Sequence, residues 1–89
     1  MSAIEQVLLE RGARYGKFTD HALITQNLKE VMYATDNFAT LQPDQKEALE
    51  MIAHKIGRIL NGDPNYDDSW KDIAGYAELV AKRLQGTEV

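Results

Sequence analysis

The sequence predicts an all-α protein: a small bundle of about four helices with a long C-terminal antiparallel helical hairpin. Three observations predict this class. Apolar residues recur at three- and four-residue spacing, glycine or proline breaks separate the periodic segments, and no segment alternates apolar and polar residues as a strand would. A chain of 89 residues is long enough for one domain and not two, so we expect a single helical domain over residues 1–89.

The first helix is expected over residues 3–11. Ser2 can cap it, with Glu5 at the capping-box spacing, and Gly12 is expected to end it. Its apolar stripe consists of Ile4, Val7 and Leu8.

A second helix is expected to begin at Thr19 or Asp20, because both residue types are good caps, and to fade near residues 35–37. The apolar residues at helical spacing in this segment are Leu23, Ile24, Leu28, Val31 and Met32.

The third helix is expected to begin at Pro43, whose fixed φ suits a first helical position, and to stop at Asn61-Gly62. Asp44 complements the positive end of the helix dipole. The stripe expected to be buried consists of Leu49, Ile52, Ile56, Ile59 and Leu60.

The fourth helix is expected to begin at Asp67 or Asp68 and to end before Gly86. Because the loop before it is short, the last two helices should form an antiparallel hairpin. One face of the fourth helix carries Trp70, Ile73, Ala77, Val80 and Leu84.

A domain this small buries only a modest fraction of its surface. We therefore expect a homo-oligomer, in which two or four copies complete a bundle.

The composition excludes several classes of function. The net charge of −4, and the lack of a short basic reading helix, argue against nucleic acid binding. Without cysteine there is no disulfide, thiolate metal site or cysteine nucleophile. No apolar run approaches the roughly 20 residues that cross a bilayer, and the first ten residues do not resemble a signal peptide. We expect a soluble cytoplasmic protein with no membrane partner.

One polar stripe on the third helix requires an explanation. Glu47, Glu50, His54 and Arg58 fall within an arc of about 80° at 100° per residue. Two carboxylates on adjacent turns can hold a hard divalent cation such as Mg²⁺. The alternative is a solvated helix face whose charges are i,i+4 neighbours.

A second acidic pair, Asp68 and Asp72, lies on the fourth helix. In an antiparallel hairpin, Asp72 and Tyr76 approach His54 and Glu50 along the third helix. Four acids converging between two helices would make an oxygen-rich metal site. The alternative for Asp68 is a helix cap and dipole complement.

Basic residues lie close to these acids. Lys55 and Arg58 could meet phosphate oxygens. A second basic cluster surrounds Tyr15, and either binds phosphate or is solvated surface. That cluster consists of Arg11, Arg14 and Lys17.

Two blocks of the sequence resemble a family of small phage and prophage proteins that has no assigned function. The blocks are ERGARYGKF (Glu10 to Phe18) and EALEMIAHKIGRILNGDPNYDDSWKDIAGYAELV (Glu47 to Val80). This resemblance implies a phage or prophage source, and hence the cytoplasm of an infected or lysogenic bacterium.

The chain also resembles, more distantly, the all-α nucleotide pyrophosphohydrolases of the MazG and dimeric dUTPase group. Their pattern is E-x-x-E on one helix and E-x-x-D on the next, with Mg²⁺ or Mn²⁺ beside a triphosphate. Glu47 and Glu50 match the first pair, and Asp72 matches the last residue. Ser69 stands where the second acid belongs, and Asp68, one residue earlier, is turned about 100° around the helix.

The resemblance implies roles for these residues. Glu47, Glu50 and Asp72 would hold the metal, with Asp68 as a partial substitute for the missing acid, and Glu50 would position the attacking water as the catalytic residue. Lys55 and Arg58 would contact phosphate. Independently of the resemblance, the candidate supporting or docking residues are His54, Tyr76, Tyr15 and Lys17.

Two functions are open at this point. The first is a nucleotide-binding or nucleotide-hydrolysing protein that uses a divalent metal. The second is a non-enzymatic phage accessory or anti-defence protein, which would bind a host defence protein or sequester a nucleotide signal.

Overall fold

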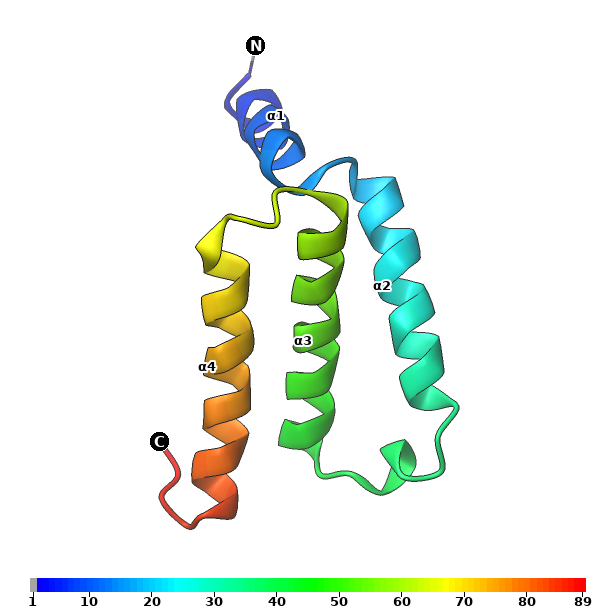
Figure 1. Cartoon of the computed structure of the whole chain (residues 1–89), viewed down its shortest axis with the longest axis vertical. Coiled ribbons are helices and arrows are strands. Elements are labelled where there is room, and N and C mark those ends of the chain that lie inside the picture. Colours follow the sequence, from blue (N-terminus) through cyan, green and yellow to red (C-terminus); the bar gives the residue numbers. More distant parts are fainter. Residues whose placement is uncertain (1) are drawn as a thin grey trace.

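The computed structural model describes residues 2–89, which form four α-helices and one short 3₁₀ turn without any strand (Figure 1). This confirms the predicted all-α class and the C-terminal antiparallel hairpin. The elements are α1 (Ala3–Tyr15), α2 (Phe18–Tyr33), η1 (Phe38–Thr40), α3 (Pro43–Asn61) and α4 (Asp67–Leu84).

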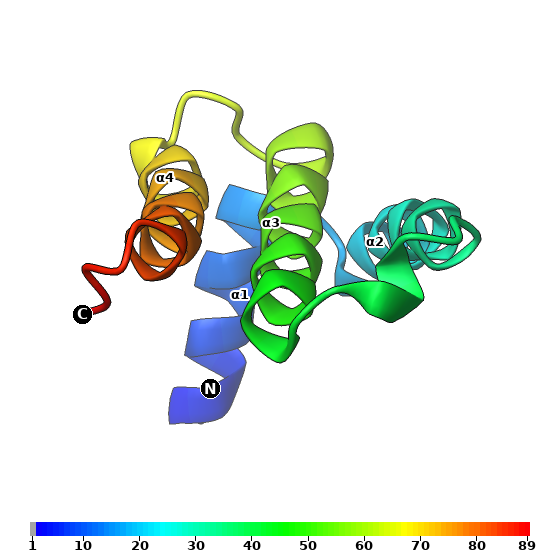
Figure 2. The same ribbon diagram turned by 90° about the horizontal axis from the view of Figure 1, so that it is seen from below.

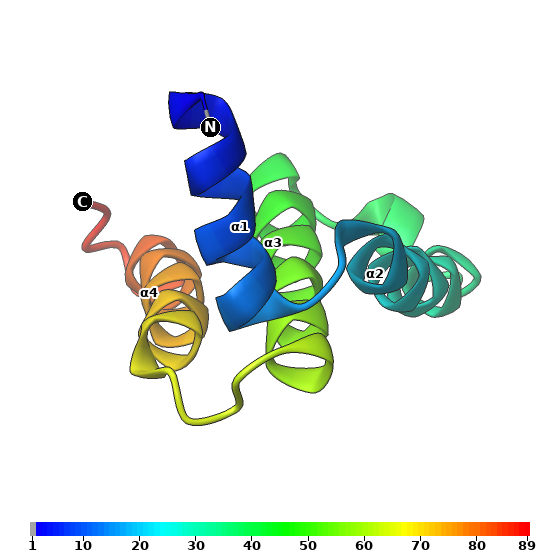
Figure 3. The ribbon, with the colours of Figure 1, turned by 90° about the horizontal axis from the view of Figure 1, so that it is seen from above.

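Helix α3 is the centre of the fold. Helices α2 and α4 lie on its two opposite sides, each antiparallel to it (Figures 1 and 2). The interfaces of α3 with α4 and with α2 are the two extensive ones. Helix α1 crosses the end of this layer at which α3 ends and α4 begins (Figure 3). The fold therefore has an open shape, with three helices side by side and a fourth across one end.

The ends of α1 follow local capping chemistry. The Ser2 hydroxyl accepts a hydrogen bond from the Glu5 backbone N–H at 3.1 Å, as predicted. The prediction that Gly12 ends the helix was wrong, since α1 continues to Tyr15. A glycine inside a helix costs only about 1 kcal/mol, whereas Gly16, which follows the helix, has a φ of 77° and a ψ of −168°, a backbone conformation that favours glycine.

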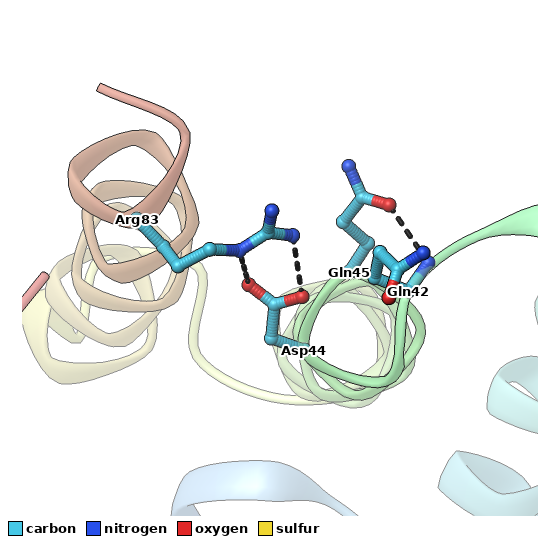
Figure 4. Close-up of polar contacts among 4 residues, drawn as sticks. All are labelled: Gln42, Asp44, Gln45 and Arg83. Carbon is cyan, nitrogen blue, oxygen red and sulfur yellow. Dashed lines mark hydrogen bonds and ion pairs between the residues drawn. The ribbon is translucent and has the colours of Figure 1, made fainter. Parts of the chain in front are cut away.

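The two long helices of the hairpin are joined by ion pairs. At the open end, the Arg83 guanidinium donates two hydrogen bonds to the Asp44 carboxylate, at 2.8 and 2.7 Å (Figure 4). At the start of α3, the Gln42 backbone N–H donates to the Gln45 side-chain oxygen at 2.9 Å (Figure 4). Asp44 therefore links two helices as well as complementing the α3 dipole.

The core of the chain is very small. Among residues 2–89, the buried hydrophobic side chains are Ala48 and Ala53 alone. The prediction of a buried stripe on α3 was wrong for Leu49 and Leu60, which are 41% and 66% exposed, while Ile52, Ile56 and Ile59 are partly buried. Helix α3 contacts its two neighbours along its flanks, and the open layer leaves part of its apolar stripe uncovered.

None of the helices within residues 2–89 combines the length and the hydropathy needed to cross a membrane.

Candidate functional site

A cavity of about 590 Å³ lies where the end of α1, the start of α2 and the C-terminal half of α3 meet. We call it the cationic cavity, because its walls carry basic residues and no carboxylate. The basic and histidine residues that line it are Arg11, Lys17, His21, His54 and Arg58; the apolar and aromatic ones are Leu8, Tyr15 and Phe18; Gly12, Gly16 and Thr19 complete it.

A buried histidine forms the inner wall of the cationic cavity. His21 on α2 is 5% exposed, and its Nε2 lies 3.0 Å from the backbone carbonyl oxygen of His54 on α3. Because a carbonyl only accepts, the Nε2–H of His21 donates this bond. Thr25 Oγ1 lies 3.2 Å from the same nitrogen. This inner wall is thus held in place by polar contacts between α2 and α3.

The two histidine rings pack edge to face. Their centroids are 4.5 Å apart, and the ring planes are nearly perpendicular, at 88°. Burial, followed by the electrostatic effects of the neighbouring His21 ring and the Arg58 guanidinium, together lower the pKa of His54 from 6.5 to about 4. His54 is therefore neutral at physiological pH.

A glycine on α3 allows α2 to approach this closely. A Cβ at Gly57 would lie 2.4 Å from Thr25 Oγ1 and 2.9 Å from His21 Cδ2. Such distances are far inside van der Waals contact, so only glycine fits without a shift of α2. The His21–Thr25 face and Gly57 therefore form one close-packed unit.

The connection between α1 and α2, which lines the cavity, is held by the last residue of α3 and by the loop that follows it. The Asn61 side-chain amide donates to the backbone carbonyls of Tyr15 and Lys17, at 2.8 and 3.0 Å. Gly16 lies between them, and a Cβ there would be 2.3 Å from the Asn61 carbonyl oxygen. The Asp63 backbone N–H donates to the Arg14 carbonyl at 2.7 Å. These contacts fix Tyr15 and Lys17 against the end of α3.

Two arginine–aromatic stacks extend from this loop contact. The Arg58 guanidinium lies 4.2 Å from the centroid of the Tyr15 ring, and that of Arg14 lies 4.3 Å from the Tyr66 ring. The ring centroids of Tyr15 and Tyr66 are 6.3 Å apart. Stacking orients the Arg58 guanidinium while leaving its N–H groups free of any carboxylate.

The cavity cations have no acidic partner. Over residues 2–89, the ion pairs involve Lys55, Lys71, Lys82 and Arg83, and none involves Arg11, Lys17 or Arg58. Unpaired cations concentrated around one hollow produce a positive local potential in a chain whose net charge is −4. This potential favours an anionic ligand.

None of the predicted acids lines this cavity. Glu50 accepts a hydrogen bond from the Tyr33 hydroxyl on α2, and this bond raises the pKa of Tyr33. Asp72 lies on α4, and its carboxylate is 2.9 Å from Lys55 Nζ on α3. Asp68 and Glu10 line a second hollow, which shares Arg11, Tyr15 and Arg58 with the cationic cavity.

The predicted carboxylates therefore do not converge within one chain. Over residues 2–89, no three histidine, aspartate or glutamate side chains gather closely enough to hold a metal ion. Glu47 is exposed on α3, and Ser69, at the position where the family pattern has an acid, is buried on α4. A divalent-cation site built from Glu47, Glu50, Asp68 and Asp72 does not fit the geometry of a single chain.

Four of the site residues predicted from the sequence do lie together. Tyr15, Lys17, His54 and Arg58 line the cationic cavity, whereas Lys55 is 9% exposed and pairs with Asp72. Tyr76 lies on α4, outside the lining. Sequence reasoning missed His21, although its spacing to Ile24, Thr25 and Leu28 places it on the inward face of α2.

Fold and cavity together define a small all-helical protein with a cavity lined by basic residues. Residues 1–84 match the family described as a domain of unknown function, DUF6378. The chain belongs to this family. No curated protein and no solved structure matches it significantly.

Proposed function

We propose that the protein binds the phosphate groups of a nucleotide-type ligand in the cationic cavity. The observation that carries this proposal is the charge of the lining: Arg11, Lys17 and Arg58 surround the hollow without any carboxylate. Arginine suits phosphate because its planar donors can contact two oxygens at once. The Arg58 guanidinium, stacked on Tyr15, is already oriented by the protein.

The apolar and aromatic residues that line the cationic cavity suit the flat base of a nucleotide-type ligand. Leu8, Tyr15 and Phe18 contribute apolar and aromatic surface beside the cations. Phe18 is 74% exposed, so its ring is accessible for stacking against a base. A volume of about 590 Å³ lies within the range typical of small-molecule sites. A flat ring joined to phosphate matches this combination better than inorganic phosphate alone.

The proposed activity is binding, and it needs no metal ion. Asp72 already has an ammonium partner in Lys55, and Glu50 has Tyr33. The resemblance to the all-α nucleotide pyrophosphohydrolases supports a nucleotide-type ligand, whereas hydrolysis with Mg²⁺ or Mn²⁺ stays a prediction. A phage protein that sequesters a nucleotide signal would use the same cavity. Docking to a host defence protein also stays a prediction.

Isothermal titration with nucleoside mono-, di- and triphosphates, in buffer containing EDTA, tests the proposal. We expect micromolar to submillimolar dissociation constants, with inorganic phosphate binding at least ten times more weakly. Arg58→Gln and Arg11→Gln should each weaken binding at least tenfold. Lys71→Gln, which removes an exposed α4 lysine outside the cavity, is the matched control and should change nothing.

Two outcomes would contradict the proposal. One is binding that survives both arginine substitutions. The other is binding that appears only with Mg²⁺ and is abolished by Glu50→Gln, which would support the carboxylate site instead.

A further inference from the structure

Helix α1 presents an apolar face that no other part of residues 2–89 covers. It has no buried residue, and Ile4, Leu8 and Leu9 are 72%, 62% and 58% exposed. Ile4, Val7 and Leu8 share one side at helical spacing. With Ala3 they line a shallow hollow of about 210 Å³, and none of these four residues is polar. We call this surface the α1 face.

The chain also lacks the interior that a monomer of its size needs. Its buried hydrophobic side chains, over residues 2–89, are two alanines, and no large side chain is fully buried. Burying apolar area is the main source of folding free energy. A domain of this length is marginally stable even with a complete core.

The accessible surface area and the radius of gyration also indicate that the chain is less compact than a monomer of its size. The accessible surface is 6351 Å², whereas a compact monomer of 10.0 kDa exposes about 5,200 Å². The excess of roughly 1,100 Å² is comparable to the 800 Å² or so that each partner buries in a standard interface. The radius of gyration is 15.1 Å, against about 12 Å for a compact chain of this length.

We propose that a second copy of this chain covers the α1 face, forming a two-fold symmetric dimer through α1. A second copy is the appropriate occupant because the missing core is needed whenever the chain is folded, and only another copy is always present with it. Two-fold symmetry brings the same apolar stripe from each copy to the axis. This inference does not rest on the proposed function.

The dimer would also bear on the cationic cavity. Leu8 lines both the α1 hollow and the cationic cavity. A second copy on the α1 face would therefore lie at the edge of that cavity.

Sedimentation equilibrium and single-cysteine cross-linking on the full chain test the inference. The natural sequence has no cysteine, so each introduced thiol is unique. We expect a mass of twice 10.0 kDa. Mild oxidation should link at least one of the variants Ile4→Cys, Val7→Cys and Leu8→Cys to itself, because symmetric positions near the axis come within disulfide range.

The matched control is Leu79 on α4, which is 50% exposed and outside the α1 face. Leu79→Cys should not cross-link, and Leu79→Glu should leave the dimer intact. Leu8→Glu should raise the dimer dissociation constant at least 100-fold.

Three results would overturn the inference. The first is a monomer at all concentrations that unfolds cooperatively. The second is a dimer that cross-links through Leu79→Cys and through none of the α1 variants, or that Leu8→Glu leaves unchanged. The third is a stoichiometric complex with a different protein in place of the second copy.

Discussion

The ammonium group of Lys55 lies 2.9 Å from the carboxylate of Asp72, and this ion pair joins α3 to α4. The Lys55 side chain is only 11% exposed, while that of Asp72 is 36% exposed. A carboxylate that the family resemblance assigns to a metal thus has its cation supplied by the chain itself. The pair holds the two helices of the hairpin together, and it engages a carboxylate that was predicted to bind a metal ion.

Removing the Lys55 ammonium should destabilise the protein. Lys55→Met leaves Asp72 without its partner in a partly buried groove, and we expect the free energy of unfolding to fall by about 1–2 kcal/mol. This is less than the 3–5 kcal/mol typical of fully buried pairs, because solvent screens Asp72. Urea denaturation at one protein concentration measures the change. Lys71→Met breaks the exposed pair with Asp67 and should have no measurable effect; equal losses in both variants would contradict the prediction.

Gly57 should not tolerate a methyl group. In Gly57→Ala the new Cβ meets Thr25 and His21, so α2 must move away from α3, at a cost of about 1–3 kcal/mol. Gly75→Ala on α4 is the matched control, since nothing lies within 4 Å of its Cβ. Relief of glycine's backbone entropy should stabilise that variant by about 0.5–1 kcal/mol. Thermal unfolding of the two variants should shift in opposite directions, and a shift of the same sign would refute this account.

Asn61 should couple stability to ligand binding. Asn61→Ala removes both hydrogen bonds to the carbonyls of Tyr15 and Lys17, and we expect a loss of about 1–2 kcal/mol. Because those residues line the cationic cavity, nucleotide affinity should fall as well, when measured by isothermal titration. Asn27→Ala, on the exposed side of α2, should leave both quantities unchanged. Unaltered affinity in a destabilised Asn61→Ala variant would mean that the loop contact does not shape the site.

His54 should make stability depend on pH below neutrality. Its pKa is about 4 in the folded protein, against an ordinary value of 6.5. Between these values the unfolded chain binds a proton that the folded chain does not, so stability falls as the pH is lowered from 6.5 towards 4. From pH 7 to pH 5 we expect a loss of about 1 kcal/mol, below the full linkage value because His54 is partly exposed.

The variant His54→Gln, compared by urea denaturation at pH 7 and pH 5, should lose this part of the dependence. A proton NMR titration of the wild type should place the His54 midpoint near pH 4. A midpoint near 6.5 would show that burial does not affect this ring.

Local signals in the sequence determined the helices. Ser2 capped α1, Pro43 began α3, and Asn61-Gly62 ended it, because capping and backbone preferences act over a few residues. The antiparallel hairpin followed from a short loop. The prediction that Gly12 ends α1 was wrong because an isolated glycine lowers the stability of a helix without ending it.

Only the tertiary structure decided which side chains meet. The polar stripe of α3 contributes Glu50 to a contact with α2, and His54 and Arg58 to the cationic cavity, while the neighbouring Lys55 pairs with Asp72 on α4. Residues within one narrow arc of a helix can have different neighbours, because α2 and α4 contact α3 on opposite sides and α1 lies near one end of it. Periodicity fixes the direction in which a side chain leaves its helix, but the packing of the other helices determines what it contacts.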